Sequence, residues 1–371
     1  MAVEFIIVGG FLGSGKTTSL TRFAQVLGAQ GRRVGLITND QAAELVDTEL
    51  AGRLCLPVGE VAGGCFCCRF PDLLAQAETL VEHGVDTLLA EPVGSCTDLV
   101  ATVYEPLRRF AGDRFRLAPF SVLLDPVRVS QILLGEGKSP LSARVAYLYA
   151  KQIEEADLVV LNKVDTLGPA ERARLMEGLS RRYSNRRLLG VSATTGEGFD
   201  DWLAMLLSPE SSRGGRHLSI DYTLYAAAEA ELGWLNGSVV LGAASFDGTH
   251  LLRTFLSEAQ QQCARAGGEI AHLKVWVSTD SAAFRISLVR SDGTALWDGG
   301  ITEPVSRLSL TVNARVAMEP EALEAAVRNG LAAAAAQAGA AIEEERWTSF
   351  RPAPPQPTYR FDAAAQETAG Q

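Results

Sequence analysis

Long apolar runs, basic clusters and a disulfide-like spacing of cysteines are all missing from this 371-residue chain. No uninterrupted apolar stretch is long enough to cross a bilayer, so we expect no membrane span. The net charge of −10 comes without a concentrated basic run, which argues against nucleic acid or an anionic membrane as the main partner. Six cysteines are too few to staple a secreted fold of this length.

The N-terminus also lacks the features of a secretory signal. It reads MAVEFIIVGGFLG, has no positive n-region, and its apolar run stops at glycines, so it predicts a first strand. We therefore expect a cytoplasmic protein. In that reducing compartment, clustered thiols more often bind metal or do redox chemistry than form disulfides.

Residues 1–207 alternate short apolar runs with helical patterns. This rhythm is typical of βαβ units and of a mostly parallel sheet with helices on both faces, hence an α/β fold. The predicted strands are Phe5–Val8, Val34–Thr38, Thr87–Ala90, Ser121–Leu124, Leu158–Leu161 and Leu188–Val191. Helices are expected between them, for example at Thr17–Gln30 and Glu171–Tyr183.

Residues 217–345 predict a smaller α+β domain after a polar linker at Ser208–Arg216. Asn236-Gly237 indicates a hairpin turn, and Glu229 and Glu231 are interpreted as the solvated face of a strand. Residues 346–371 are expected to form a Pro-rich extended tail. The remaining predicted elements are helices at Thr249–Ala266 and Pro320–Ile342 and strands at Ile270–Val277, Phe284–Val289 and Leu308–Met318.

A phosphate-binding loop follows the first predicted strand. Gly10–Thr17 reads GFLGSGKT and fits the pattern G-x-x-x-x-G-K-[ST] between a strand and a helix. In such a loop the backbone N–H groups surround phosphates, Lys16 adds a point charge, and Thr17 offers a hydroxyl to Mg²⁺. The predicted phosphate-site residues are Gly10, Gly13, Ser14, Gly15, Lys16, Thr17 and Thr18.

The sequence after the strand Leu158–Leu161 predicts which base is bound. Asn162-Lys163-Val164-Asp165 places a carboxylate where it can accept hydrogen bonds from N1 and the exocyclic N2 of guanine, a donor pair that adenine lacks. Further on, Ser192-Ala193 resembles the loop of GTPases whose backbone contacts the guanine oxygen. GTP is therefore the expected nucleotide.

Three thiols stand together in GGCFCC, at Cys65, Cys67 and Cys68. Thiolates favour Zn²⁺, Co²⁺ or Cu⁺ over Mg²⁺. Three cysteines in four residues do not easily close a tetrahedral site, so an outside ligand such as Asp40 or water is expected. The isolated Cys55, Cys96 and Cys263 are interpreted as packing residues.

Together, GFLGSGKTT, GGCFCC, LLAEPVG and LNKVD resemble the CobW-like metallochaperone GTPases, relatives of the hydrogenase and urease nickel-insertion GTPases HypB and UreG. The resemblance covers roughly residues 3–205. It implies a GTPase that binds a transition metal at the C-x-C-C motif and delivers it to a client protein. A homodimer is possible.

The resemblance assigns roles to the two switch segments. Glu91 and Gly94 match the family's E-x-x-G, which implies that Glu91 lies near Mg²⁺ and that Gly94 senses the γ-phosphate. Asp47 keeps its place in the first switch, which implies a role at Mg²⁺ with Thr17 and Glu91. Asp40 stands where the family usually has a glutamate that is a candidate ligand of the transition metal.

The expected function is a GTP-hydrolysing metallochaperone with Lys16, Thr17 and Glu91 as its catalytic residues, and with Zn²⁺ or Co²⁺ as cargo. Two alternatives stay open. The first is a GTP-dependent activation factor for a cobalamin or corrinoid enzyme, in which the thiols are structural. The second is a non-catalytic metal-binding module that needs no GTP.

Overall fold

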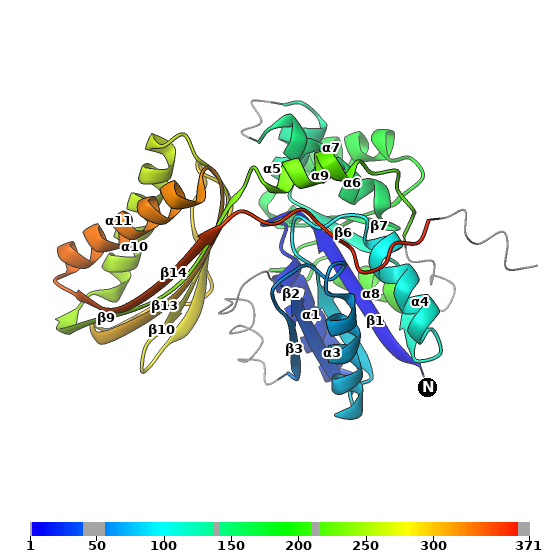
Figure 1. The fold of residues 1–371 in the computed structure, drawn as a ribbon, viewed down its shortest axis with the longest axis horizontal. Helices are drawn as coiled ribbons and strands as arrows, with labels where there is room; N and C mark the ends of the chain where they lie inside the picture. Colours follow the sequence, from blue (N-terminus) through cyan, green and yellow to red (C-terminus); the bar gives the residue numbers. More distant parts are fainter. Residues whose placement is uncertain (1, 40–55, 137–140, 209–214, 363–371) are drawn as a thin grey trace, which may run out of the picture. The chain divides into compact units, whose positions relative to one another are not determined.

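The computed structural model describes residues 2–39, 56–136, 141–208 and 215–362 (Figure 1). These residues form two compact units. The first unit contains the described residues up to Tyr225 together with 355–362, and the second contains Ala226–Pro354. The predicted linker at Ser208–Arg216 lies largely outside the described residues.

The first unit is built on an eight-stranded parallel sheet, as the α/β rhythm predicts. The strand order is β3-β2-β4-β1-β6-β7-β8, and β5 pairs with β1. Each of the six predicted strands is present. The strands are β1 (Val3–Gly10), β2 (Val34–Asn39), β3 (Val58–Val61), β4 (Thr87–Glu91), β5 (Phe115–Leu117), β6 (Ser121–Leu124), β7 (Leu158–Leu161) and β8 (Arg187–Gly190).

Helices cover this sheet on both faces. Ile6 and Val8 of β1 face one buried cluster, which also contains Phe23 and Trp202 from α1 and α8. Phe5 and Ile7 alternate with them and are also fully buried, as expected for a strand between two helical layers. The helices are α1 (Lys16–Ala29), α3 (Phe70–Glu82), α4 (Glu105–Ala111), α5 (Pro126–Arg128), α6 (Ala143–Glu155), α7 (Pro169–Arg182), α8 (Phe199–Leu207) and α9 (Tyr222–Glu229), with π-helical turns at Val100–Tyr104 and Val129–Leu133 and a 3₁₀ turn, η3, at Val164–Thr166.

The second unit is an antiparallel sheet whose core packs against two helices. The strand order is β12-β11-β10-β13-β9-β14, and apolar side chains of α10 and α11 complete the buried cluster. The predicted α+β class is therefore confirmed. The elements are β9 (Gly233–Phe246), α10 (Gly248–Arg265), β10 (Glu269–Ser278), β11 (Ala283–Leu288), β12 (Leu296–Trp297), β13 (Val305–Ala317), α11 (Pro320–Ala338) and β14 (Ala341–Phe350).

The predicted hairpin turn at Asn236-Gly237 is wrong, because both residues lie inside β9. A Cβ at Gly237 would collide with the indole of Trp347 on the neighbouring strand β14, so the glycine makes room for that ring. Asn236 is buried and accepts a hydrogen bond from Asn313 at 2.8 Å. Gly237 is therefore required by the packing of a side chain from another strand, and a local turn pattern does not reveal such a requirement.

Two further predicted elements differ from the structure. Glu229 is the last residue of helix α9 and is buried, so it is not on the solvated face of a strand. The helix predicted at Pro320–Ile342 ends at Ala338, because Gly339 adopts a left-handed φ of 67° that stops it. The chain then forms β14, and the extended Pro-rich segment begins only after Phe350.

Candidate functional site

The predicted nucleotide residues gather at the carboxyl edge of the parallel sheet. β1 ends at Gly10, β4 ends at Glu91, and β7 ends directly before Asn162. In open parallel sheets, ligands bind outside the carboxyl ends of the strands.

The phosphate loop depends on glycines with left-handed backbone angles. φ is 136° at Gly10, 78° at Gly13 and 99° at Gly15. A Cβ at Gly15 would collide with the side-chain amide of Asn162. Side chains at these positions would strain the loop or push the guanine-side residues away from it.

Lys16 and Thr17 open α1 and face Glu91. The Thr17 hydroxyl donates to a Glu91 carboxylate oxygen at 3.1 Å, and the Lys16 ammonium lies 3.9 Å from the same oxygen. Lys16 also donates to the Gly10 carbonyl at 2.9 Å. All three side chains are buried, so their polar groups interact with one another rather than with bulk water.

Asn162 joins three segments that are far apart in sequence. Its side-chain amide donates to the Ser14 carbonyl at 2.9 Å, and its oxygen accepts from the Ala193 N–H at 3.0 Å. Ser192 stands beside Ala193, is fully buried, and its hydroxyl accepts from the Thr195 N–H at 3.0 Å. The structure therefore brings the phosphate loop, the N-K-x-D segment and the Ser192-Ala193 loop together.

Lys163 is fixed by a carboxylate that the sequence did not single out. It adopts a left-handed φ of 60° and donates to the Gly13 carbonyl and to an Asp125 oxygen, each at 2.7 Å. Burial alone would raise the pKa of Asp125, but Lys163 and the backbone N–H of Arg128 hold it below its usual value. The signal for Asp125 was its place directly after the strand Ser121–Leu124, at the same edge of the sheet.

Asp165 is exposed, unlike its neighbours Asn162 and Val164. It borders a pocket of about 480 Å³ that is also lined by Arg172 and Glu197. An exposed carboxylate beside an open pocket can accept hydrogen bonds from a ligand without first breaking a buried contact.

The three clustered thiols lie at the same carboxyl edge, after β3. The Cys65 sulfur is 2.8 Å from that of Cys67 and 3.2 Å from that of Cys68, and the Cys67 and Cys68 sulfurs are 3.8 Å apart. Cys65 and Cys67 are buried, whereas Cys68 is partly exposed. Within the described residues, these three form a group of ligand atoms compact enough to hold one metal ion.

Asn39 holds the thiol turn in shape, a role that the sequence did not predict. Its amide donates to the Val61 carbonyl at 2.9 Å and to the Gly64 carbonyl at 2.7 Å, and its oxygen accepts from the Phe66 N–H at 2.9 Å. Gly63 supplies the left-handed φ of 75° that the turn requires. Asn39 is the last residue of β2, so the turn is attached directly to the end of the strand before the predicted first switch.

The hydrogen bonds among these thiols shift their pKa values in opposite directions. The pKa of Cys65 lies well below its ordinary value, because hydrogen bonds with the Cys67 and Cys68 thiols stabilise its thiolate. Donation to Cys65 raises the pKa of Cys67 well above normal and that of Cys68 to about 11. Cys65 is therefore the thiol that ionises most easily. Cys96, interpreted from sequence as a packing residue, is buried.

The C-terminal segment 355–362 packs on the thiol turn. The Gln356 N–H donates to the Cys68 sulfur at 3.2 Å, and Thr358 bonds the carbonyls of Cys67 and Cys68, both at 2.9 Å. Arg360 then pairs with the buried Asp98 at 2.8 Å. The predicted extended tail thus covers the partly exposed thiol.

The other predicted site residues are Asp40, Asp47, Thr18 and Gly94. Asp40 and Asp47, together with Cys55, lie outside the described residues. Thr18 is the third residue of α1. Gly94 lies so close to the phosphate loop that a Cβ there would come within 3.1 Å of the Leu12 nitrogen.

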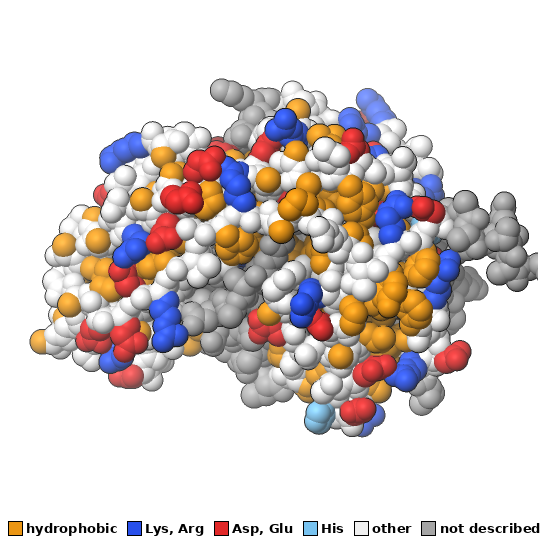
Figure 2. Space-filling model, in the orientation of Figure 1, with side chains coloured by type: hydrophobic (Ala, Val, Ile, Leu, Met, Phe, Trp, Pro, Cys, Tyr) orange, Lys and Arg blue, Asp and Glu red, His pale blue; other side chains and the backbone are white. Residues whose placement is uncertain are grey.

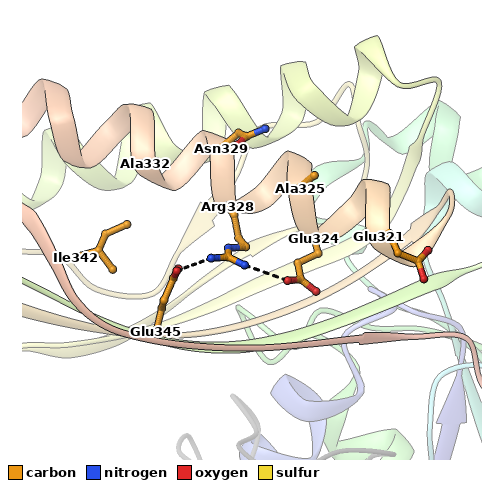
Figure 3. A pocket seen from close by; sticks show the side chains of 8 residues that line it. All are labelled: Glu321, Glu324, Ala325, Arg328, Asn329, Ala332, Ile342 and Glu345. Atoms are coloured by element: carbon orange, nitrogen blue, oxygen red, sulfur yellow. Dashed lines mark hydrogen bonds and ion pairs between the residues drawn. The ribbon is translucent and has the colours of Figure 1, made fainter.

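The second unit has a pocket of its own, between α11 and β14 (Figure 3). Its volume is about 490 Å³. Arg328 points into it and bonds Glu324 at 3.3 Å and Glu345 at 2.5 Å. These charges satisfy one another, so the pocket offers a ligand no uncompensated Arg328 charge.

The outer surface does not add a charged interface on the face shown in Figure 2. Blue and red side chains are interspersed there over both units, with hydrophobic side chains between them. Within the described residues, no helix is both long and apolar enough to cross a membrane.

Comparison with known proteins assigns the domain that contains this site to a family. The sequence model of the family described as CobW/HypB/UreG, nucleotide-binding domain, matches residues 4–188. The chain belongs to this family through that domain. The resemblance stated from the motifs is therefore confirmed, and the CobW-type domain contains both the phosphate loop and the clustered thiols.

Two curated relatives each match about half of this chain. The zinc chaperone CobW of Sinorhizobium sp is 27% identical over 219 residues, 52% of this chain and 59% of the relative. The zinc chaperone CobW of Pseudomonas aeruginosa is 32% identical over 200 residues, 46% of this chain and 51% of the relative. The chain thus spans between half and three-fifths of the length of these relatives.

A solved structure is similar over a longer stretch. The Zn(II)-bound YjiA GTPase from Escherichia coli is 18% identical, with 89% of this chain and 99% of that chain covered and a TM-score of 0.36.

Proposed function

We propose that this protein is a GTP-hydrolysing metallochaperone that carries Zn²⁺ or Co²⁺ to a client protein. The observation that carries the proposal is the group of three thiols within 4.8 Å of one another, at the same sheet edge as the phosphate loop. The similarity to zinc chaperones supports it. Soft thiolates select Zn²⁺ or Co²⁺ over Mg²⁺, so this group serves the cargo rather than the nucleotide.

In the proposed cycle, GTP binds at Gly10–Thr18, with Asn162, Lys163 and Asp165 facing the guanine. The Ser192-Ala193 backbone completes the base site. Thr17, Glu91 and Asp47 hold Mg²⁺, which neutralises charge on the phosphates when it is bound. Phosphoryl transfer to water then depends mainly on positioning and charge neutralisation, and we assign this work to Lys16, Thr17 and Glu91.

The cargo metal binds to Cys65, Cys67 and Cys68, with Asp40 as a further candidate ligand. Two contacts support communication with the nucleotide. Thr38 of β2 pairs with Glu91 of β4, and the next residue, Asn39, clamps the thiol turn. A movement of Glu91 or Gly94 on GTP hydrolysis therefore reaches the turn through adjacent strand ends, which loosens the metal for the client.

The test measures Co²⁺ binding by its thiolate charge-transfer absorption. Titrations are compared with Mg²⁺ plus a non-hydrolysable GTP analogue, with GDP, and without nucleotide. Metallochaperone function predicts tight binding with the analogue and weak binding with GDP. Cys67→Ala should abolish most of the absorption, whereas Cys263→Ala, a buried cysteine in the second unit, should leave it intact.

Each other outcome points to one of the alternatives. Equal affinity in all three states would favour a metal-binding module that needs no GTP. Absence of a thiolate band in every state would overturn metal delivery and favour a GTP-dependent activation factor with structural thiols.

A further inference from the structure

We propose that the C-terminal segment 355–362 is a strap over the cargo-metal thiols, which must open before the metal can enter or leave. The inference rests on the proposed function, because it adds a control to the same site. The segment reads PQPTYRFD and belongs to the same compact unit as the thiols, although nearly 300 residues separate the two in sequence. Figure 1 draws it in red.

The start of the strap is bound to the thiol turn through its backbone. Pro357 favours an extended conformation at Gln356, and in an extended chain the N–H groups of alternate residues point to the same side. The Gln356 N–H donates to the Cys68 sulfur at 3.2 Å, and the Thr358 N–H donates to the Cys67 carbonyl at 2.9 Å. The strap therefore lies directly on Cys68, the partly exposed thiol of the triplet.

An ion pair fastens the other end of the strap. The Arg360 guanidinium donates to an Asp98 carboxylate oxygen at 2.8 Å, and the Tyr222 hydroxyl donates to the same oxygen at 2.8 Å. Asp98 is fully buried, so its charge depends on these donors. It also adopts a left-handed φ of 62°, which is uncommon for a residue other than glycine. The fold thus holds a buried carboxylate in a strained position beneath the strap.

Aromatic contacts attach the strap to α3 and α4. The ring centroid of Tyr359 lies 5.6 Å from that of Phe70 and 4.9 Å from that of Phe110. The Arg109 guanidinium carbon lies 3.9 Å from the ring centroid of Phe361. Phe110 and Tyr359 remain 52% and 38% exposed, so these contacts lie at the surface rather than in the core.

The strap can leave without opening the fold. Every residue of 355–362 is at least partly exposed, and removal of the segment therefore uncovers Cys68 without breaking the buried clusters. The two prolines, Pro355 and Pro357, restrict the free segment and reduce the conformational entropy that is lost when it closes. Such a segment suits a cover that opens and closes on a folded domain.

The latch also connects the strap to the nucleotide. Asp98 lies four residues after Gly94, in the loop that follows β4, and Gly94 lies close to Leu12 of the phosphate loop. Gly94 is proposed to sense the γ-phosphate. The GTP position of this loop therefore holds Asp98 beneath Arg360 and keeps the strap closed. Displacement of the loop after hydrolysis withdraws the latch, so the strap opens when the metal is due for release.

The experiment follows two unrelated reactions that both require an open strap. One is alkylation of Cys68 in the metal-free protein, located by mass spectrometry, and the other is transfer of bound Zn²⁺ to a chelator. Both rates are measured in the full-length protein and in Arg360→Ala, Arg360→Lys and Tyr359→Ala. Arg116→Ala is the matched control, because Arg116 also forms a partly buried ion pair in the first unit, with Glu4 near the start of β1.

We expect Arg360→Ala to accelerate both reactions about five- to tenfold, less than loss of a fully buried charged hydrogen bond would, because Arg360 is partly exposed. Tyr359→Ala should accelerate them roughly threefold to tenfold, through loss of its aromatic contacts. Arg360→Lys retains the charge and should stay close to the unmodified protein, and the control should not change.

Two further readouts distinguish a strap from general damage to the site. A cover slows entry and exit alike, so the equilibrium Zn²⁺ affinity should change by less than about threefold while both rates rise by the same factor. Both reactions should be slower with the GTP analogue than with GDP. Arg360→Ala should remove that difference, because the latch is then absent in both states.

Each contrary result has one meaning. Unchanged rates in both Arg360→Ala and Tyr359→Ala would overturn the strap and leave metal binding at the triplet. A loss of Zn²⁺ affinity equal to the acceleration of transfer would also overturn it, since the variants would then have damaged the site. Equal rates with the analogue and with GDP would overturn the link from Gly94 to the latch. If the unmodified protein binds no Zn²⁺, the proposed function fails, whereas the alkylation of Cys68 still tests the strap.

Discussion

Replacement of Asn39 by alanine should separate metal binding from nucleotide binding. The Asn39 amide and oxygen make three hydrogen bonds that clamp the thiol turn, to Val61, Gly64 and the Phe66 N–H, at 2.7 to 2.9 Å. The side chain contributes no sulfur or carboxylate of its own. Its removal therefore tests whether preorganisation of the thiols, rather than their number, sets the metal affinity.

The magnitude follows from those hydrogen bonds. Each contributes about 1 kcal/mol net, so the turn loses about 2–4 kcal/mol. Two backbone bonds to the Cys65 carbonyl, from Cys68 at 3.0 Å and Arg69 at 2.9 Å, remain in the variant. We therefore expect the lower part of the range. At 1.4 kcal/mol per tenfold, Zn²⁺ affinity should fall roughly 30- to 100-fold.

The assay is competition for Zn²⁺ with a chelator in the presence of the GTP analogue. Asn185→Ala serves as the matched control, because Asn185 is an exposed asparagine of the same unit, away from the turn. GTP-analogue binding, measured in parallel, shows that each variant is folded. Wild-type Zn²⁺ affinity in Asn39→Ala would refute the reasoning, since the turn would then hold its shape without the clamp.

Three further outcomes follow from the structure. Lys16→Ala should abolish GTPase activity, measured as phosphate release, because the only charge assigned to the phosphates inside the loop is removed; substantial residual turnover would contradict this role. Arg360→Ala removes the ion-pair partner of the buried Asp98. It should speed alkylation of Cys68 several-fold, since the segment 355–362 then loses this attachment near the thiol turn; an unchanged rate would show that the segment is held without the ion pair. Glu155 is fully buried and its pKa is raised well above the ordinary value by burial, so the folded state binds its proton more tightly than the unfolded state does. Its contribution to stability is complete below about pH 4.5 and is lost as pH rises toward the folded pKa. Glu155→Gln should therefore gain stability relative to wild type between pH 5 and 8 in urea unfolding, and parallel curves would argue against a raised pKa.

Secondary structure was predictable where the local sequence pattern agrees with how the segment packs in the folded protein. The strands at Ser121–Leu124 and Leu158–Leu161 have the predicted bounds, because a strand buried on both faces is a continuous apolar run. Asn236-Gly237 and Glu229 failed for the opposite reason. Gly237 leaves space for an indole from another strand, and Glu229 is buried at the end of a helix. Neither the packing of the indole nor the burial of the glutamate can be recognised from the neighbouring sequence.

The sequence by itself determined the features that short segments encode. The phosphate loop needs glycines, a lysine and a hydroxyl at fixed spacing, and the N-K-x-D segment and C-x-C-C triplet likewise carry their chemistry within a few residues. The alternation of strands and helices also belongs to this class, because periodicity is a local property of the chain.

Tertiary structure alone decided which distant side chains meet. Gln356 and Cys68 are separated by 288 residues, yet a hydrogen bond joins them. In the sequence, Asn39 is only the residue before Asp40, and 26 residues separate it from Cys65. Only the parallel register of β2, β3 and β4 places the ends of these strands at one edge of the sheet, where Asn39 clamps the thiol turn. The path of the chain sets such contacts, and no short pattern can encode them.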